Sequence, residues 1–378
     1  MFSNSELELI QYEFSDIKSV YLNTAYFGPI PKRTQKIIKL GVQRAADPSF
    51  YSMQEWLSIP DQTRESIANL LGCLPKNIMH STSTGDVVAL IGRSLNRNIK
   101  ERVALIDEEY PSNVLPWMFL KEKEKIVLDV LPKTPVVDID YLEKNLHKET
   151  TILNISYISF KSGRKINLLE LGPYLKSKNI TLILDATQAF GSLGISKEEL
   201  SYIDAFVCST YKWLLSPYGH CFAYLSDDFL TSLESEKISW INSDSFVNCQ
   251  ELTKYSTKLI TGAVRFDRGQ SPNMLNMRGV LSSITLLSEL GLDKIQTYNK
   301  SLVDHFCDKF DSKDFFLEVP REYLANIISL KSKSGDLNNV IERLNHNNID
   351  VSVREGSLRI SLHLFNTIDQ VDLLLRVL

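Results

Sequence analysis

A lysine close behind an apolar strand is the most reactive candidate in this sequence. Lys212 follows the predicted strand Ala205–Cys208 and lies between Tyr211 and Trp213. Because lysine is strongly hydrated, removing it from water lowers its pKa and leaves a nucleophilic amine that can form a Schiff base. The alternative is a lysine that buries only its aliphatic stem and keeps its ammonium in water. Taken by itself, the position favours this alternative.

An aspartate with a nearby amide ends a second apolar strand. Asp185 follows Ile183 and Leu184, and Gln188 comes three residues later. Ligands of open α/β sheets collect at the carboxyl ends of strands, so this carboxylate lies where it could bind one. There it could keep a pyridinium nitrogen protonated, as pyridoxal phosphate requires to act as an electron sink. An aspartate that caps a helix is an equal alternative.

A run of hydroxyl side chains separates the predicted strand Ile78–Ser81 from the predicted helix Gly85–Leu95. The run is Ser81-Thr82-Ser83-Thr84-Gly85. Hydroxyls and free backbone amides at a helix N-terminus form an anion site that suits a phosphate monoester. The run is not the GxxxxGK[ST] loop of nucleoside triphosphate binding. An ordinary helix cap is the alternative.

Together, the amine, the carboxylate and the hydroxyl-rich helix start predict one cofactor, pyridoxal 5′-phosphate. Each signal is weak, but these are the groups that this cofactor requires. Tyr110 follows the predicted strand Arg102–Ile106 and could stack on the cofactor ring. A core aromatic side chain at a turn is the alternative for Tyr110.

The composition is that of an ordinary globular protein. The 378 residues are 43% hydrophobic and 23% charged, which excludes a disordered chain, a coiled coil and a collagen-like repeat. The length favours roughly two or three domains. A net charge of −4 argues against nucleic acid or an anionic membrane as a partner.

The cysteines and the N-terminus bear on metal sites and localisation. Five cysteines without a CxxC pair argue against a disulfide framework or a zinc site. The sequence has neither the pattern of a signal peptide nor a run of about 18 uncharged apolar residues. We therefore expect a cytoplasmic protein without a metal or a membrane span.

Short apolar strands alternate with helices through the middle of the chain. The predicted strands are Ile78–Ser81, Arg102–Ile106, Lys125–Asp129, Thr151–Ile155, Thr181–Leu184, Ala205–Cys208 and Cys221–Leu225. The predicted helices are Gly85–Leu95, Asn113–Leu120, Ile139–Leu146 and Leu168–Ser177. This alternation is typical of a parallel sheet that is covered on both faces.

The last third of the chain has a different pattern. After a polar loop, Trp240–Pro272, Gly279–Leu290 is predicted to be the start of a long helix. The later predicted elements are strand Ala325–Leu330, helix Leu337–Leu344, hairpin arms Asp350–Val353 and Ser357–Ser361, and helix Thr367–Val377. We predict a large domain at residues 31–271 and a smaller α+β domain at 272–378. Residues 1–30 are expected to pack near the active site and the small domain.

The sequence resembles the class V aminotransferase family of pyridoxal-phosphate enzymes, in the branch of cysteine desulfurases, selenocysteine lyases and isopenicillin-N-epimerase-like proteins. The motifs occur in the family's order over almost the whole chain. They are YLNTA at 21–25, GP at 28–29, STSTGD at 81–86, EYPSNVLPW at 109–117, DATQAFG at 185–191, STYKWLLSPYG at 209–219 and LRISLHLFNT at 358–367. The resemblance implies the type I fold, with a mainly parallel seven-stranded sheet, helices on both faces, and a smaller C-terminal α+β domain.

The resemblance also implies roles at the matching positions. Lys212 would hold the cofactor as a Schiff base and move the substrate's α-proton, and Asp185 would pair with the pyridinium nitrogen. Gln188 would reach the phenolic oxygen, and Tyr110 would stack on the ring. Arg359 would bind the substrate carboxylate, because guanidinium and carboxylate match fork to fork.

Further residues would bind the phosphate, line the substrate pocket or reach a second subunit. The phosphate-binding residues would be Ser83, Thr84, Gly85, Ser209 and Tyr211. Asn23, Tyr26 and a loop near Tyr51 to Trp56 would line the substrate pocket. Gly269, Gln270 and Ser271 resemble a loop that reaches the neighbouring subunit's phosphate site, which implies a homodimer with composite active sites.

Two positions depart from the desulfurase pattern. Desulfurases need a mobile cysteine ahead of the carboxylate-binding arginine, and residues 345–358 contain none. Phe160 stands where desulfurases carry an asparagine. Aromatic residues occur at this position in the epimerase-like branch. Arg354 could contact a second acidic group of the substrate, although a solvated charge at a hairpin is the favoured alternative.

We therefore expect a pyridoxal-phosphate enzyme that acts on an amino acid, with transamination favoured because the cysteine is absent and Arg359 is present. A cysteine-independent C–S or C–Se lyase, or an epimerase, is the alternative within the family. A catalytically inactive binding protein is an alternative from another class, although Lys212, Asp185 and Arg359 are intact. A dinucleotide-dependent oxidoreductase is disfavoured, because no GxGxxG motif follows an early strand.

Overall fold

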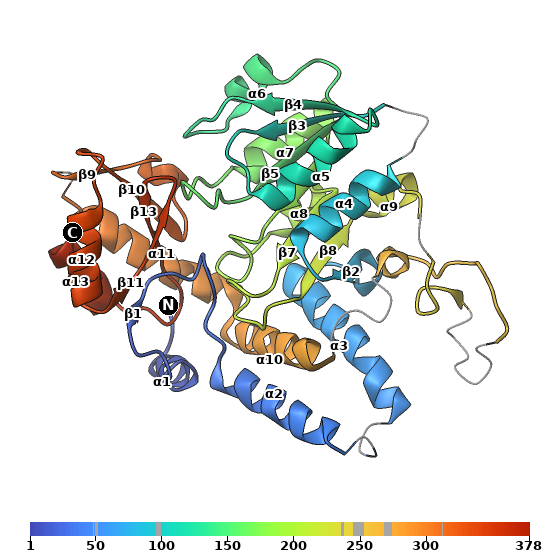
Figure 1. Cartoon of the computed structure of the whole chain (residues 1–378), viewed down its shortest axis with the longest axis horizontal. Coiled ribbons are helices and arrows are strands. Elements are labelled where there is room, and N and C mark those ends of the chain that lie inside the picture. Colours follow the sequence, from blue (N-terminus) through green and yellow to red (C-terminus); the bar gives the residue numbers. More distant parts are fainter. Residues whose placement is uncertain are drawn as a thin grey trace.

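The computed structural model describes residues 1–47, 49, 52–95, 100–235, 238–244, 253–267, 274–311 and 313–378. These residues form a large unit around a seven-stranded sheet and a small unit around a four-stranded sheet (Figure 1). Among the helices of these ranges, none is long and apolar enough to cross a membrane.

The seven-stranded sheet is mainly parallel, as predicted. Its strands are β2 (Ile78–Ser81), β3 (Arg102–Ile106), β4 (Val127–Leu131), β5 (Ile152–Ser156), β6 (Thr181–Asp185), β7 (Ala205–Ser209) and β8 (Cys221–Leu225). They lie in the order β2-β8-β7-β6-β5-β3-β4. Strand β8 runs antiparallel to both of its neighbours, and the other pairs are parallel.

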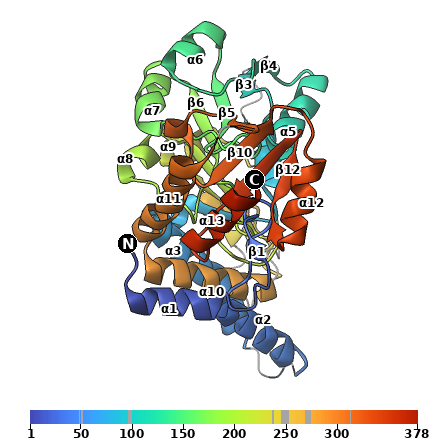
Figure 2. The same cartoon turned by 90° about the vertical axis from the view of Figure 1, so that its left-hand side faces the viewer.

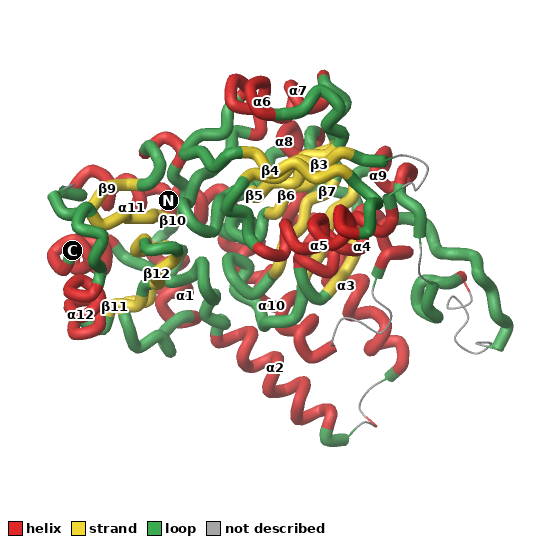
Figure 3. Tube along the Cα trace, turned by 45° about the horizontal axis from the view of Figure 1, so that its top comes forward, coloured by secondary structure: helices red, strands yellow, loops and turns green. Residues whose placement is uncertain are grey.

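Helices cover both faces of this sheet, because its strands are apolar on both sides. Val103 and Leu105 of β3 belong to one apolar cluster, whereas Ala104 and Ile106 belong to the other. Figure 3 shows helices on either side of the strands. The first cluster includes α4 (Thr84–Ser94), α5 (Pro111–Glu122) and α9 (Asp227–Ser232), and the second includes α6 (Ile139–Asn145), α7 (Leu168–Ser177) and α8 (Lys197–Ser201).

A further layer of helices supports the second face. Helix α10 (Met274–Leu290) packs against α2 (Lys32–Ala45) and α3 (Met53–Leu71), and α1 (Asn4–Glu13) contacts α2. Helix α3 continues through Pro60, which normally ends a helix. Burial of Ile67 and Leu71 in the large core holds this helix in place despite the missing hydrogen bond.

The small unit has an antiparallel sheet of its own (Figure 2). The strands β9 (Phe315–Leu317), β10 (Ile327–Ser332), β12 (Ser352–Arg354) and β13 (Ser357–Ser361) lie in the order β12-β13-β10-β9. Helices α11 (Leu292–Lys309), α12 (Asn338–His346) and α13 (Ile368–Val377) contribute to the same apolar cluster.

The N-terminal segment joins the small unit. Strand β1 (Val20–Tyr21) pairs in parallel with β11 (Ile349–Asp350), and Asn23 forms a bridge to Ser361. The chain then enters the large unit, where the amide of Gly28 donates to the carbonyl of Tyr211. Residues 20–28 therefore connect the small unit to the loop that carries Lys212.

The structure refines several predicted elements. The predicted strands Ile78–Ser81, Arg102–Ile106, Cys221–Leu225 and Ser357–Ser361 agree residue for residue with the structure. Most of the other predicted strands shift or lengthen by one or two residues. The first arm of the C-terminal hairpin is split into β11 and β12. The pattern does not predict helices α1, α2, α3, α8 and α9. The helix predicted to start at Gly279–Leu290 begins earlier, at Met274, and ends at Leu290, where the separate helix α11 follows.

The predicted domain boundaries remain predictions. The boundary between residues 271 and 272 lies outside the described residues. Helix α10, on its C-terminal side, contributes Val280, Ile284 and Leu287 to the core of the large unit. The described part of the predicted loop Trp240–Pro272 includes a short 3₁₀ helix, Ala263–Phe266.

Candidate active site

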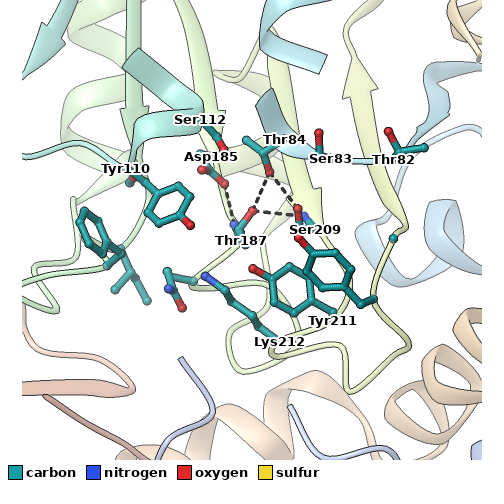
Figure 4. Close-up of a pocket in the computed structure, with 16 residues that line it drawn as sticks. Thr82, Ser83, Thr84, Tyr110, Ser112, Asp185, Thr187, Ser209, Tyr211 and Lys212 are labelled. Carbon is teal, nitrogen blue, oxygen red and sulfur yellow. Dashed lines mark hydrogen bonds between the residues drawn. The ribbon is translucent and has the colours of Figure 1, made fainter. Parts of the chain in front are cut away.

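A cavity lies at the carboxyl ends of the central strands (Figure 4). Its lining includes Ser156, Asp185 and Ser209, the last residues of β5, β6 and β7. Because these strands are parallel, their carboxyl ends meet at one edge of the sheet. Side chains from distant parts of the chain therefore gather here. We call this the strand-end cavity.

Lys212 projects its amine into this cavity (Figure 4). The side chain is only 5% exposed, so the alternative of a lysine with its ammonium in water is wrong. Burial and the positive charge of Arg359 lower the pKa of Lys212 to about 7, while the charge of Asp185 opposes the shift. Nζ lies 5.4 Å from the ring centre of Tyr110 and 5.6 Å from that of Tyr211. At neutral pH a large fraction of the amine is therefore uncharged and nucleophilic.

The loop that carries Lys212 is held by close backbone packing. A Cβ on Gly28 would lie 1.9 Å from the carbonyl oxygen of Lys212. Gly191, with φ +106°, approaches the carbonyl of Trp213 so closely that a Cβ would lie 2.3 Å from its oxygen. The same carbonyl accepts a hydrogen bond of 3.0 Å from Nε2 of His363, whose pKa burial lowers to about 4. The N-terminal segment, the turn after β6 and the small unit thus fix this loop jointly.

Asp185 provides a buried carboxylate in the same cavity. Oδ1 accepts a 2.9 Å hydrogen bond from the amide of Thr187, and Oδ2 accepts one of 3.1 Å from Nδ2 of Asn113. Burial raises the pKa of Asp185, against the opposing effects of these bonds and of the charge of Lys212. Asp185 forms no ion pair with Lys212 or any other described residue. The segment after Asp185 is a turn, so the helix-cap alternative is wrong.

Glu109 provides a second buried carboxylate, which Asn113 links to Asp185. Nδ2 of Asn113 also donates to Oε2 of Glu109 at 3.2 Å, so one amide bridges the two acids. Oε1 of Glu109 accepts a 3.0 Å bond from the amide of Ser156 at the end of β5. Burial raises the pKa of Glu109. Glu109 and Asn113 therefore orient Asp185 and tie α5 to the ends of β5 and β6.

Three hydroxyls meet at the start of α4. Oγ1 of Thr84 lies 3.1 Å from Oγ1 of Thr187 and 3.0 Å from Oγ of Ser209 (Figure 4). Ser83 caps the helix, since its side chain accepts from the amide of Asp86. The capping alternative is therefore correct for Ser83, whereas Thr84 is buried among polar partners. Hydroxyl donors and a helix N-terminus are thus placed together, as an anion site requires.

Tyrosines flank Lys212 on both sides. The ring of Tyr110 packs edge-on against Phe160, with centroids 5.1 Å apart. The ring of Tyr211 packs against Tyr218 at 4.6 Å, and burial raises its pKa. Figure 4 shows Tyr110 and Tyr211 facing the cavity. Tyr110 is thereby placed beside the lysine amine, where a planar ligand could stack on it.

A second cavity of about 390 Å³ adjoins the first and shares the tyrosines and Lys212 with it. Arg359 lines it and is only 2% exposed, so the alternative of a surface ion pair is wrong. Nε donates to Oγ of Ser352 at 3.2 Å, and Nη1 donates to the carbonyl of Phe160 at 2.8 Å. Nη2 is buried and has no hydrogen-bond partner among the described residues. Burial and the charge of Arg354 lower the pKa of Arg359 to about 10. We call this the arginine cavity.

Gln188 and Tyr26 also lie at this second cavity. The side chain of Gln188 is fixed by a 3.1 Å bond to the carbonyl of Ala25 and a 2.9 Å bond from Nε1 of Trp213. Its amide therefore has little freedom left to reach a ligand. Tyr26 lines the arginine cavity and is 58% exposed, which places it at the mouth.

Other predicted residues lie elsewhere. Gly85 is in the first turn of α4 beside Ser112, and it is not among the residues that line either cavity. Asn23 bridges to Ser361 and likewise lines neither cavity. Gly269, Gln270 and Ser271 lie outside the described residues, as do Tyr51 and the side chain of Trp56. The prediction of a loop near Tyr51 to Trp56 is wrong from Met53 onward, because helix α3 begins there.

The residues present fit pyridoxal 5′-phosphate. The buried carboxylate of Asp185 has a raised pKa and forms no ion pair in the part of the chain that the structure describes, and a pyridinium N–H would supply a cation. The amine of Lys212 is a nucleophile for an aldehyde, and the hydroxyls of Thr84 and Ser209 lie at a helix start that suits a phosphate. When bound, this cofactor supplies the electron sink that makes the α-proton of an amino acid removable. Within the described ranges, no group of three or more His, Cys, Asp or Glu could hold a metal.

The family model described as "Aminotransferase class-V" matches residues 48–374. The chain belongs to the class V aminotransferase family. It is 24% identical over 292 residues to isopenicillin N epimerase of Streptomyces clavuligerus, which covers 76% of this chain and 73% of that protein. It is 23% identical over 337 residues to a probable cysteine desulfurase of Pyrococcus abyssi, which covers 84% of this chain and 82% of that protein.

A solved structure shows the shared fold. A variant of C-DES with glycine covalently linked to its PLP cofactor superposes with a TM-score of 0.86 at 16% identity, over 97% of this chain and 98% of that chain. The predictions of the family, of the type I fold and of pyridoxal 5′-phosphate as cofactor are confirmed.

Several residues of this class V site were not predicted from the sequence. Thr187, Glu109 and Asn113 lie within the recognised motifs, but no role was assigned to them. The sequence feature that could have identified them is their spacing. Thr187 follows Asp185 by two residues, and Glu109 and Asn113 are four residues apart across the start of α5. Only the three-dimensional structure shows that one amide joins both acids.

Replacing Asp185 by asparagine tests the role of the buried carboxylate. We expect Asp185→Asn to retain the cofactor but to lower turnover by several orders of magnitude, because the amide cannot keep a ring nitrogen protonated. Steady-state kinetics and the absorbance of bound cofactor measure both effects. Asp204→Asn is the matched control, because Asp204 is also buried but lies outside the cavities. Near-normal turnover of the Asp185 variant would contradict this role.

The lowered pKa of Lys212 predicts a pH-dependent stability in the cofactor-free protein. Between about pH 7 and 10.5 the unfolded chain retains a proton on this lysine that the folded chain has lost, so stability rises with pH. We therefore expect Lys212→Met to be more stable than the wild type by a few kcal/mol at pH 7, and by much less at pH 10. Urea unfolding at both values measures the gap. Lys197→Met, at an exposed lysine, should show no such trend, and a constant gap for Lys212→Met would contradict the burial of the amine.

Proposed function

We propose that this protein is an aminotransferase that acts on an α-amino acid and uses Lys212 as its single base. The observation that carries the proposal is the composition of the two cavities. Among the described residues that line them, Lys212 is the one whose pKa burial brings near neutrality, and neither a cysteine nor a histidine is present. General base catalysis is most effective when the pKa of the base lies near the working pH.

The described cysteines do not support desulfurase chemistry, which requires a thiolate in the site. Cys208 and Cys221 are buried in strands, and Cys73 and Cys307 are partly buried. Burial raises the pKa of all of them, that of Cys73 and Cys221 to about 12. None of these lines either cavity. Cys249 lies outside the described residues.

Three side chains of the protein have different roles in the proposed transamination. Arg359 binds the substrate carboxylate through its unpartnered Nη2, which orients the α-carbon beside Lys212. The neutral amine of Lys212 takes the α-proton and later delivers it to a different carbon. A base that works from one face does not invert the α-carbon, so one lysine suits transamination better than epimerisation. Asp185 would hold the ring nitrogen of the bound cofactor and would keep it protonated through its negative charge.

We also propose a homodimer. Residues 269–271 resemble a loop that reaches into a neighbouring subunit, although they lie outside the described residues. An exposed apolar stripe on α5, formed by Leu115, Met118 and Phe119, is compatible with burial against another chain.

Product analysis of the holoenzyme tests the proposed activity. The enzyme is incubated with a panel of L-amino acids and an added 2-oxo acid. We expect a new 2-oxo acid and a new amino acid in equal amounts, without ammonia, and no turnover by Lys212→Ala. Ammonia with pyruvate or sulfide would instead identify a lyase, and a D-amino acid would identify an epimerase. The absence of any product would favour an inactive binding protein.

A further inference from the structure

A second guanidinium faces the arginine cavity. Arg354 and Arg359 both line it, together with Lys212, and no carboxylate is found among its described lining residues. Lys212 becomes neutral near pH 7, but both guanidinium groups keep their charges. The cavity therefore carries more positive charge than one substrate carboxylate would neutralise.

The hairpin register places both arginines on one side of the sheet. In the antiparallel pair of β12 and β13, Arg359 lies opposite Ser352, and Arg354 lies opposite Ser357. Opposite residues share a face, and so do residues two apart along a strand. Arg354 and Arg359 are therefore diagonal neighbours, whose backbones are about 7–8 Å apart in such a pair. Two side chains from this arrangement can bind two ends of one small molecule.

Arg354 has no acidic partner among the residues that the structure describes. Its Nη1 donates a 2.8 Å hydrogen bond to the carbonyl of the adjacent Val353, and its guanidinium forms no ion pair with any described residue. Its guanidinium lies 5.7 Å from the ring centre of Tyr26, which favours an orientation toward the cavity mouth. Its positive charge lowers the pKa of both Arg359 and Lys212.

We propose that the arginine cavity binds an α-amino acid with a second acidic group on its side chain. Arg359, the buried arginine, holds the α-carboxylate, and Arg354, at the mouth, holds the side-chain anion. This proposal rests on the proposed function, because it assumes that an amino acid reacts beside Lys212. It replaces the interpretation of Arg354 as a solvated hairpin charge.

Paired substrates of equal size test this assignment. L-Glutamate against L-glutamine, and L-aspartate against L-asparagine, differ in the side-chain charge alone. Each is titrated into the holoenzyme, and the change in absorbance of the bound cofactor gives its affinity without requiring turnover. The variants are Arg354→Gln and Arg354→Lys. Arg376→Gln is the matched control, because Arg376 is an exposed arginine of the small unit that does not line the cavity.

We expect the wild type to bind at least one acid more tightly than its amide by at least about tenfold, the effect of one charge-assisted contact. In Arg354→Gln this ratio should fall close to one, Arg354→Lys should retain part of it, and Arg376→Gln should keep it. A wild type without this preference, or a preference that survives in Arg354→Gln, would overturn the inference but leave the proposed function intact. If no amino acid changed the absorbance, the proposed function would fail as well.

Discussion

The active site depends on one constraint: the amine of Lys212 and the carboxylate of Asp185 are buried in the same cavity but form no ion pair with each other. Burial of either ion costs several kcal/mol unless an opposite charge compensates it. Lys212 responds with a pKa lowered to about 7, and Asp185 with a raised pKa. Both groups are thereby left in need of a partner. A cofactor with an electrophilic carbon and a cationic ring nitrogen satisfies both, which is why the site selects pyridoxal phosphate.

The fold maintains this separation from several directions. The loop of Lys212 packs against Gly28 and Gly191 at distances that no side chain would permit, and His363 of the small unit binds the same loop. On the other side, Asn113 bridges Asp185 to Glu109 and so to the end of β5. The small unit also supplies Arg359. The two units are therefore coupled at the point where the reaction occurs.

Much of this arrangement could be predicted from the sequence. The hydrophobic pattern locates the apolar strands, and therefore also the residues at or just after their carboxyl ends, such as Asp185 and Lys212. Because the carboxyl ends of parallel strands lie at the same edge of a sheet, these residues can be predicted to lie close together. The contacts of Thr187 with Thr84 and of Asn113 with Asp185 join distant segments, which no local pattern encodes. The prediction that Gly85 and Asn23 belong to the site rests on motif membership alone, and neither residue lines the two cavities. Helix α3 is not predicted from the sequence, because Pro60 normally ends a helix. Burial of Ile67 and Leu71 in the core holds the helix in place despite this proline.

The covalent attachment site of the cofactor tests the central claim most directly. Borohydride reduction of the holoenzyme, followed by proteolysis and peptide mass spectrometry, locates the lysine that carries the cofactor. The account predicts a single phosphopyridoxyl group on Lys212, because this is the amine that burial leaves uncharged beside Asp185. A label on another lysine, or no label on a protein that retains its cofactor, would contradict it.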